Sequence, residues 1–172
     1  MVDKDAVRRG YDALAEAYAA DRVEDGRGRE VLSRFLDELP GQVHVLDAGC
    51  GGGAPVLRHL AASGSAVGMD ISRAQLKLAA DRVPDAGVAQ GDLTALPFCD
   101  GAFDAVTAYH SLIHVPREQH QRVIDEFARV LDDRGRLLIS EGPEEWTGSN
   151  PDWLGTGVEM QWHIAGAEAT RR

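Results

Sequence analysis

Residues 43–54, VHVLDAGCGGGA, restrict the fold more than any other part of the sequence. A short apolar run ends in the carboxylate of Asp47, and four of the next six residues are glycines. An apolar run that leads through glycines into a helical pattern predicts a buried strand, a tight turn and a helix N-terminus. Glycine is needed at such a turn because the backbone takes left-handed angles and a Cβ would keep a nucleotide away from the exposed amides. The stretch therefore predicts a loop that binds a flat, polar ligand at close range.

Two classes of cofactor use such a loop, and Asp47 distinguishes them. The spacing of Gly49, Gly51 and Ala54 fits the dinucleotide fingerprint, with Asp70 following at a suitable distance. A dinucleotide brings a pyrophosphate dianion, which the carboxylate of Asp47 would repel. S-adenosylmethionine instead brings an ammonium and a sulfonium, which this carboxylate would attract. We therefore favour S-adenosylmethionine over a nicotinamide cofactor.

The same stretch resembles the first motif of the class I S-adenosylmethionine-dependent methyltransferases, acid-x-Gly-x-Gly-x-Gly. The matching residues are Asp47, Gly49, Gly51 and Gly53. The segment GDLTALPFCDGAFD, which begins at Gly91, resembles a later acidic motif of that family. The resemblance implies that Asp70 binds the ribose hydroxyls, that Asp92 accepts the adenine amino group and that Leu93 packs on the ring. It also implies cofactor contacts for Ile71 and Tyr109. Leading helices lie over the cofactor in this family, which implies contacts for Tyr11 and Tyr18 as well; packing of these two aromatic residues in the core is the other interpretation.

Short apolar segments alternate with helical patterns along the chain, which predicts an α/β fold with a parallel sheet covered on both faces. Strands are expected at 43–47, 66–70, 88–90, 103–109 and 136–141, with a turn at 132–135. Helices are expected at 4–20, 31–39, 55–63, 72–83 and 116–131, with a linker at 21–29 and a Ser72–Gln75 capping box. The resemblance implies a doubly wound, Rossmann-like sheet in the order 3-2-1-4-5. Ligands bind such sheets at the point where the strand order reverses.

Methyl transfer is an in-line displacement at an activated sulfonium, so holding the acceptor in place is the main task of the protein. Where the acceptor must lose a proton, the candidates for a base are Tyr109, His110 and His114, which follow the fourth strand, with His163 as an outsider. A packed structural turn is the other interpretation of residues 110–114. His110 and His114 have no third ligand at helical spacing, so we expect no metal site there.

The region after the fourth strand reads AYHS, whereas related enzymes that methylate nucleic-acid bases carry an Asn/Asp-Pro-Pro-aromatic motif at that place. The resemblance is instead to the branch that acts on small molecules, in which this region and the segment that carries Trp162 enclose the acceptor. We expect no nucleic-acid partner, because the net charge is −10 and the sequence contains no basic stripe.

Composition adds three expectations. Nothing resembles a signal peptide, and no apolar run approaches the roughly 20 residues of a membrane span, so a cytoplasmic protein without a membrane partner is expected. The only two cysteines, Cys50 and Cys99, have no metal-site spacing. Sixteen arginines but two lysines stand against 28 acidic residues. This balance is typical of proteins adapted to high salt, and equally of a genome that exchanges lysine for arginine.

The whole chain is expected to be one methyltransferase domain: helices over the site at 1–40, a cofactor-binding core at 43–141, and the start of an acceptor-side region at 142–172. Members of the family usually carry two more strands, an antiparallel pair beyond the fifth, which we expect to be absent here. The chain is therefore interpreted as truncated. An uncovered apolar edge of the fifth strand would favour association, for example as a homodimer.

Two other functions remain open: a nicotinamide-dependent oxidoreductase, against which Asp47 argues, and a non-catalytic module that has kept the cofactor pocket.

Overall fold

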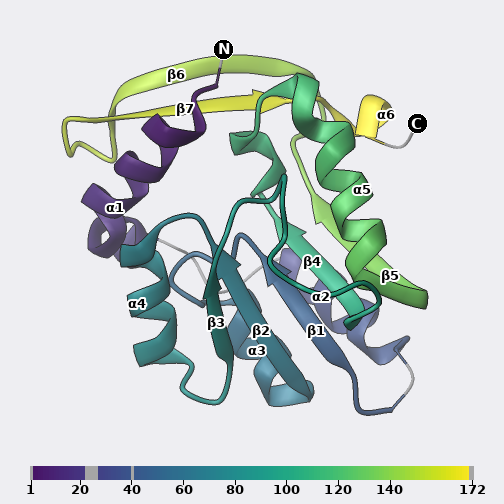
Figure 1. Cartoon of the computed structure of the whole chain (residues 1–172). Helices are drawn as coiled ribbons and strands as arrows, with labels where there is room; N and C mark the ends of the chain where they lie inside the picture. Colours follow the sequence, from purple (N-terminus) through teal and green to yellow (C-terminus); the bar gives the residue numbers. More distant parts are fainter. Residues whose placement is uncertain (1, 22–26, 40, 171–172) are drawn as a thin grey trace.

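The structure is a computed structural model that describes residues 2–21, 27–39 and 41–170. At its centre lies a five-stranded parallel sheet in the order β3-β2-β1-β4-β5, which confirms the order implied by the resemblance (Figure 1). The strands are β1 (His44–Ala48), β2 (Ser65–Asp70), β3 (Gly87–Gln90), β4 (Phe103–Tyr109) and β5 (Leu131–Ser140). The strand order reverses between β1 and β4, so the carboxyl ends of these two strands open a crevice above the sheet.

The two central strands are apolar on both faces because helices cover both faces of the sheet. Leu46 in β1 pairs in register with Val106 in β4, and both side chains are fully buried. One face is covered by α2 (Arg27–Asp37), α3 (Val56–Ser63) and α4 (Arg73–Arg82), and the other by α5 (His120–Val130) and the segment between β3 and β4. Two short 3-10 turns, η1 (Leu112–His114) and η2 (Arg117–Gln119), connect β4 to α5.

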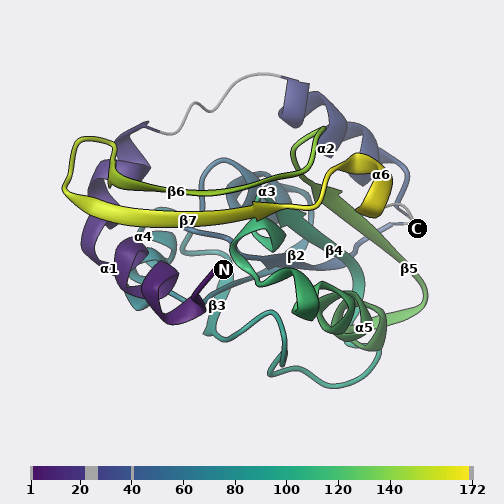
Figure 2. The same ribbon diagram turned by 90° about the horizontal axis from the view of Figure 1, so that it is seen from above.

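The first helix and a hairpin near the other end of the chain form a roof over the carboxyl ends of the strands. The helix α1 (Lys4–Asp21) packs beside an antiparallel pair, β6 (Trp146–Trp153) and β7 (Val158–Ile164), which crosses above the sheet (Figures 1 and 2). The contact is close: a Cβ at Gly10 of α1 would lie 3.0 Å from the Cε of Met160. Met160 is completely buried, together with Val7 and Leu14 of α1. A last helix, α6 (Ala167–Thr170), follows the hairpin.

Three expectations about the elements were wrong. The hairpin β6–β7 was not expected; its strands pair with each other, and within the described ranges no strand pairs with the outer edge of β5. The turn expected at 132–135 lies inside β5 as a bulge, because Leu131 pairs with Phe103 and Arg136 already pairs with Ala105. Part of the expected linker is helical, since α2 begins at Arg27, and residues 22–26 lie outside the described part.

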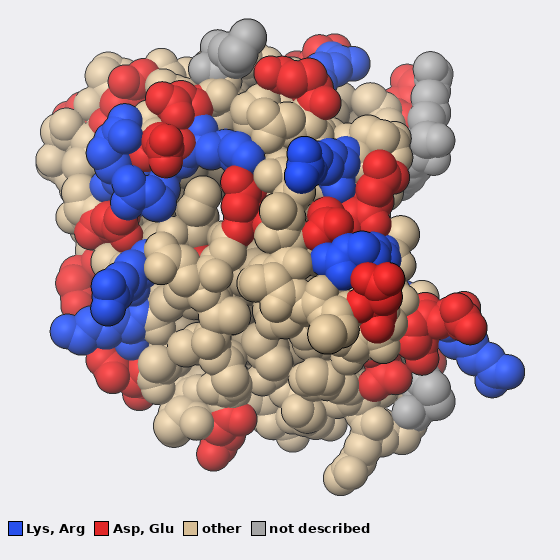
Figure 3. All heavy atoms as spheres, in the orientation of Figure 1, with Lys and Arg blue, Asp and Glu red and all other residues tan. Residues whose placement is uncertain are grey.

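Acidic and basic side chains are interspersed on the molecular surface. On the face shown in Figure 3, red and blue groups adjoin one another over the upper half, and the lower middle is largely uncharged. Arg129 is one such site, with the carboxylates of Glu126 and Asp100 each 2.8 Å from its guanidinium.

Candidate active site

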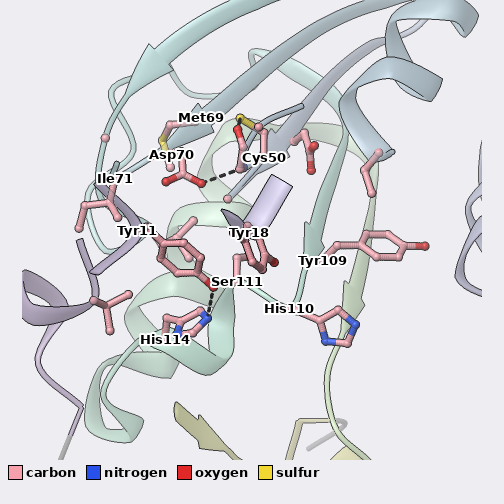
Figure 4. Close-up of a pocket in the computed structure, with 18 of the residues that line it drawn as sticks. Tyr11, Tyr18, Cys50, Met69, Asp70, Ile71, Tyr109, His110, Ser111 and His114 are labelled. Carbon is pink, nitrogen blue, oxygen red and sulfur yellow. Dashed lines mark hydrogen bonds between the residues drawn. The ribbon is translucent and has the colours of Figure 1, made fainter. Parts of the chain in front are cut away.

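A pocket of about 1000 Å³, including its mouth, lies between the carboxyl ends of the strands and the roof helix α1. Its walls come from α1, the glycine loop after β1, the ends of β2 and β3, and the segment that follows β4. The side chains that line it converge from these separate elements (Figure 4). The pocket lies where the strand order reverses, which is where doubly wound sheets bind their ligands.

Three carboxylates line the pocket, and each lies at or just beyond the carboxyl end of a different strand. Asp47 is the next-to-last residue of β1, Asp70 is the last residue of β2, and Asp92 lies two residues beyond the end of β3. Asp47 is only 1% exposed, and the hydroxyl of Thr107 on the neighbouring strand donates a hydrogen bond of 3.0 Å to its Oδ1. The parallel sheet therefore brings together in space the three acids that were selected from the sequence.

Asp70 is held at the edge of the glycine loop. The backbone N–H groups of Gly51 and Ser72 donate hydrogen bonds of 2.9 and 2.8 Å to its two carboxylate oxygens. Burial raises the pKa of Asp70 more than these hydrogen bonds lower it, so its pKa lies above the ordinary value. The carboxylate is thus oriented by backbone donors while it lines the pocket.

Asp92 is bound by a residue of the roof helix. The ammonium of Lys4 lies 2.6 Å from its Oδ2, and Thr94 donates to its Oδ1 from both its backbone N–H and its hydroxyl, each at 2.8 Å. Burial opposes ionisation of Asp92, but the hydrogen bonds from Lys4 and Thr94 outweigh it and lower the pKa of the carboxyl. Sequence reasoning did not identify Lys4 as a site residue.

The glycines of the loop occupy positions with different structural requirements. Gly49 has φ +86°, and a Cβ there would lie 2.2 Å from the Cβ of Ser111, so only glycine allows the segment after β4 to approach. Gly51 lines the pocket. Gly53, also predicted to bind the cofactor, packs against α4, with a Cβ 3.1 Å from the Cα of Ala79, and it does not line the pocket. Its place in the motif is a packing position.

The remaining predicted cofactor contacts, Ile71, Leu93, Tyr18 and Tyr109, line the pocket. Tyr11 also lines it, next to Tyr18, with ring centroids 5.2 Å apart. Tyr18 and Trp153 of the hairpin are neighbours, at 5.3 Å between centroids. The sequence placed Tyr11 and Tyr18 on one helical face, and the resemblance implied that this helix lies over the site. Arg82 of α4 also lines the pocket and was not predicted; a Cβ at Gly52 would lie 3.3 Å from its guanidinium.

The candidate bases occupy different surroundings. Figure 4 shows Tyr109 and His110 on one side of the pocket and Tyr11 with His114 on the other. The hydroxyl of Tyr109 donates to the carbonyl of Gly28 at 3.0 Å, and burial, followed by the charge of Asp47, raises its pKa. His110 is exposed, with φ 53°. His163 lies outside the pocket lining, with its Nδ1 2.5 Å from the hydroxyl of Thr147.

His114 has both ring nitrogens engaged. Its Nδ1 lies 2.9 Å from the carbonyl oxygen of Gln161, and its Nε2 lies 2.8 Å from the hydroxyl of Tyr11. Because a carbonyl oxygen can only accept, Nδ1 donates, and in a neutral ring Nε2 then accepts the proton of Tyr11. Burial lowers the pKa of His114 to about 4, with a further lowering by His110, so the ring is neutral at pH 7.

The comparisons with known proteins agree with this geometry. The family model described as a methyltransferase domain matches residues 46–139, more than half of the chain. The methyltransferase GfsG of Streptomyces halstedii is 38% identical over 137 residues, which cover 76% of this chain and 46% of that protein. The 27-O-demethylrifamycin SV methyltransferase of Amycolatopsis mediterranei is 34% identical over 160 residues, covering 78% and 57% of the two chains. This chain belongs to the methyltransferase-domain family.

A solved structure of a DhpI–SAH complex has the same fold, with a TM-score of 0.75 and 20% identity over 95% of this chain and 80% of that one. The chain spans about half the length of the two curated relatives, 46% and 57%. None of the described helices is both long and apolar enough to cross a membrane.

Proposed function

We propose that this chain binds S-adenosylmethionine and transfers its methyl group to a small-molecule acceptor, which leaves S-adenosylhomocysteine. The observation that carries the proposal is the arrangement of Asp47, Asp70 and Asp92 around one pocket at the ends of neighbouring strands. Three carboxylates match three parts of this cofactor: a cationic ammonium, a pair of ribose hydroxyls and the adenine amino group. Membership of the methyltransferase-domain family supports the same cofactor.

The residues present fit this cofactor. Asp47 would bind the methionine ammonium and Asp70 the ribose, while the Cβ-free backbone at Gly49 and Gly51 leaves room beside them. Leu93 is 9% exposed and supplies an apolar wall at the Asp92 end. A buried carboxylate is stable beside a cation and unfavourable beside a phosphate, so the donor set suits S-adenosylmethionine better than a dinucleotide.

When bound, S-adenosylmethionine supplies an activated methyl group on its sulfonium. The residues of the chain then hold the acceptor and take up its proton where it has one. Tyr11 suits the first task, because it lines the pocket and its hydroxyl is held by the Nε2 of His114 at 2.8 Å. Burial lowers the pKa of His114 to about 4, so this histidine is a weak base at pH 7, and Tyr109 and His110 remain the candidates for taking up a proton.

A small molecule is the acceptor class that we favour. Helix α1 and the segment after β4 both line the pocket, and Trp153 and Trp162 of the hairpin pack against their aromatic residues Tyr11, Tyr18 and His114. Such a wall suits an apolar or aromatic molecule with few polar groups. The relative from Amycolatopsis mediterranei is named for a small organic acceptor, 27-O-demethylrifamycin SV.

The test compares ligand affinities of the wild type and two variants by calorimetry. Asp47→Asn keeps the shape of the side chain but removes its charge, so it should weaken S-adenosylmethionine and S-adenosylhomocysteine by about 1.5–3 kcal/mol, the range for a hydrogen bond to a charged group. Adenosine, which has no ammonium, should be almost unaffected. Asp70→Ala should weaken all three ligands alike, because each of them carries the ribose.

NAD is the fourth ligand, because its binding distinguishes a nicotinamide-dependent oxidoreductase from a methyltransferase. Tight NAD binding that improves when Asp47 is neutralised would overturn the proposed cofactor. A non-catalytic binding module would bind S-adenosylmethionine with the same pattern but would show no turnover with a panel of hydroxyl, amine and thiol acceptors.

A further inference from the structure

The segment between β3 and β4 forms part of the pocket wall but contains almost no regular structure. Asp92 and Leu93 line the pocket. Residues 91–102, all of which the structure describes, contain no helix or strand, and their one β-bridge joins Asp92 to Ala95. A segment of this kind keeps a fixed shape only where groups from other elements hold its backbone.

Helix α5 supplies the side chains that hold this segment. The carboxylate of Glu126 accepts a hydrogen bond of 2.6 Å from the N–H of Leu96, and the guanidinium of Arg129 donates to the Leu96 carbonyl at 3.0 Å. The same guanidinium donates to the carbonyl of Phe98 at 2.8 Å. Glu126 and Arg129 also pair with each other at 2.8 Å, and the hydrogen bond from Arg129 is the main reason that the pKa of Glu126 is lowered to about 2. The two side chains therefore bond both backbone groups of Leu96, as a neighbouring strand would.

Arg122, one turn earlier on α5, holds the part of the segment that reaches the pocket. Its Nε donates to the carbonyl oxygen of Thr94 at 2.7 Å. The N–H of Ala95 belongs to the same peptide group and donates to the backbone carbonyl of Asp92 at 2.9 Å. The N–H and the hydroxyl of Thr94 both donate to the Asp92 carboxylate, each at 2.8 Å. One peptide group is thus bonded to α5 through its carbonyl and closes the turn of residues 92–95 through its N–H.

We propose that Arg122 is a positioning residue for the cofactor pocket. It lies outside the pocket lining and acts through Thr94, whose place it fixes, on the direction of the Asp92 carboxylate and the placement of Leu93. The inference rests on the proposed function, in which Asp92 accepts the adenine amino group. It adds that recognition of this amino group depends on an arginine that does not touch the cofactor.

A purely structural role for Arg122 makes a different prediction. Arg122 is exposed, and one hydrogen bond from an exposed side chain adds little to the stability of a fold. If Arg122 served only to attach the segment to α5, its removal would lower the melting temperature slightly and would change the affinity for all ligands by the same factor. A positioning role requires that its removal weaken ligands with the 6-amino group more than ligands without it.

The test compares, by calorimetry, S-adenosylhomocysteine with an analogue that lacks the 6-amino group. The wild type should prefer S-adenosylhomocysteine about tenfold, the effect of a hydrogen bond to a charged partner. Arg122→Met replaces the Nε–H donor by a methyl group and should reduce this preference to about threefold or less, because Thr94 no longer holds Asp92 in one orientation. Both ligands bind the same variant, so a change in its overall stability does not affect the ratio.

Two further variants separate the donor from the charge. Arg122→Gln is neutral, like Arg122→Met, but keeps an N–H at the same distance along the side chain, so it should restore most of the preference. Arg117→Met is the control for the loss of a nearby arginine, because Arg117 lies on η2, pairs with Glu145 at 2.6 Å and does not line the pocket. Arg117→Met should behave as the wild type. Because Arg122 is exposed, both of its variants are expected to fold.

The pKa of Asp92 is a second readout, measured by NMR on its carboxyl carbon without ligand. Hydrogen bonds from Lys4 and Thr94 lower this pKa against the effect of burial. Arg122→Met should therefore raise the pKa of Asp92, and Arg122→Gln should bring it back towards the wild-type value.

The outcomes separate this inference from the proposed function. A tenfold preference that survives in Arg122→Met would overturn the positioning role, and so would an equal loss of preference in Arg122→Gln or Arg117→Met. Equal affinity of the wild type for the two ligands would also overturn it. In each of these cases S-adenosylhomocysteine still binds, and the cofactor assignment stands. Failure of the wild type to bind S-adenosylhomocysteine at all would overturn the proposed function and this inference together.

Discussion

The carboxylate of Asp12 on α1 accepts a hydrogen bond of 2.7 Å from the hydroxyl of Ser72, the residue that caps the start of α4. The N–H of Ala74 in the first turn of α4 donates to the same oxygen at 3.2 Å, and Arg8 pairs with the other oxygen at 2.9 Å. A carboxylate is favourable at a helix N-terminus because of the unpaired N–H groups and the helix dipole there. The roof helix is therefore fastened to the layer that covers the sheet.

We expect Asp12→Ala to loosen α1 from this layer. The loss of a cap of this kind costs about 1 kcal/mol, which in a chain of this length lowers the melting temperature by about 2–4 °C. Hydrogen exchange should become faster across residues 4–21 and weaker binding of S-adenosylhomocysteine should accompany it. Asp5→Ala is the control, because the side chain of Asp5 on the same helix is 76% exposed. Equal exchange in the two variants would show that Asp12 does not fasten the helix.

His114 should make the stability of the fold depend on pH. Burial lowers its pKa from 6.5 to about 4. Between these values the unfolded chain binds more protons than the folded one, so stability should fall as the pH drops from 6.5 towards 4. The loss should not exceed about 3.5 kcal/mol, which is 2.5 pKa units at about 1.4 kcal/mol per unit.

Urea unfolding at several pH values in this range measures the effect. The slope should be smaller in His114→Gln than in the wild type, and it should be retained in His59→Gln, since His59 lies on α3 outside the pocket lining. Parallel curves for the wild type and His114→Gln would assign the pH dependence to other groups.

Gly49→Ala should be strongly destabilising for two separable reasons. A non-glycine residue at φ +86° is strained by about 1–2 kcal/mol, and the new Cβ would overlap with the Cβ of Ser111 at 2.2 Å. At Gly51, where φ is +52°, an added Cβ would have its nearest neighbour, the Oε1 of Gln75, at 3.7 Å. Gly51→Ala should therefore show the conformational cost alone.

Denaturant unfolding of Gly49→Ala, Ser111→Gly and the double variant tests the overlap. Ser111→Gly loses the hydrogen bond of its hydroxyl to the Ala48 carbonyl, 2.7 Å, but it removes the overlapping atom. The double variant should therefore be more stable than the sum of the single effects predicts. Strict additivity would mean that Ser111 moves aside without cost.

The surplus of acidic residues leads to a prediction about salt. With 28 acidic against 18 basic residues, repulsion between surface charges opposes the compact state at low ionic strength. If the surface is adapted to high salt, the melting temperature should keep rising from about 0.1 M to about 3 M KCl, well beyond the range where screening is complete. A melting temperature that stays constant above about 0.5 M KCl would instead attribute the scarcity of lysine to the composition of the genome.

The elements that could be predicted are those in which local pattern and buried environment agree. The strand expected at 103–109 is confirmed as β4 (Phe103–Tyr109), and the second strand begins one residue before its expected start. Both faces of these strands are covered, so the strands are apolar along their whole length. This pattern can be recognised in the sequence without knowing which elements cover them. Ser72 caps α4 as expected, but within the described residues the Gln75 side chain does not return the hydrogen bond of a capping box.

The hairpin could not be predicted because its stability comes from distant contacts. Strand β6 (Trp146–Trp153) contains Gly148 and Pro151, shows no alternation of apolar and polar residues and is mostly exposed. Its partner β7 is fixed by the burial of Met160 against α1. The polar residues and the glycine of β6 therefore give no sign in the sequence that α1 packs against this hairpin.

The residues of the site likewise include some that could be predicted from the sequence and some that could not. The three acids could be predicted because each stands at or just beyond the end of a short apolar segment, and parallel strands align their carboxyl ends. Lys4 could not, because the pattern of α1 shows which residues share a face but not which partners they meet. Its partner Asp92 lies 88 residues further along the chain.

The roof of the pocket joins the two ends of the chain, with the backbone N–H of Asp3 bound to the side chain of Gln161, 158 residues later. During synthesis at about 5–20 residues per second, the first helix therefore waits for roughly 10–30 s before its docking surface on β7 exists. Throughout that interval the sheet can assemble, but Val7 and Leu14 have no Met160 to pack against. Every residue that lines the pocket lies at or before Val115, so the cofactor can meet all of its pocket residues before the hairpin that packs on α1 has been made.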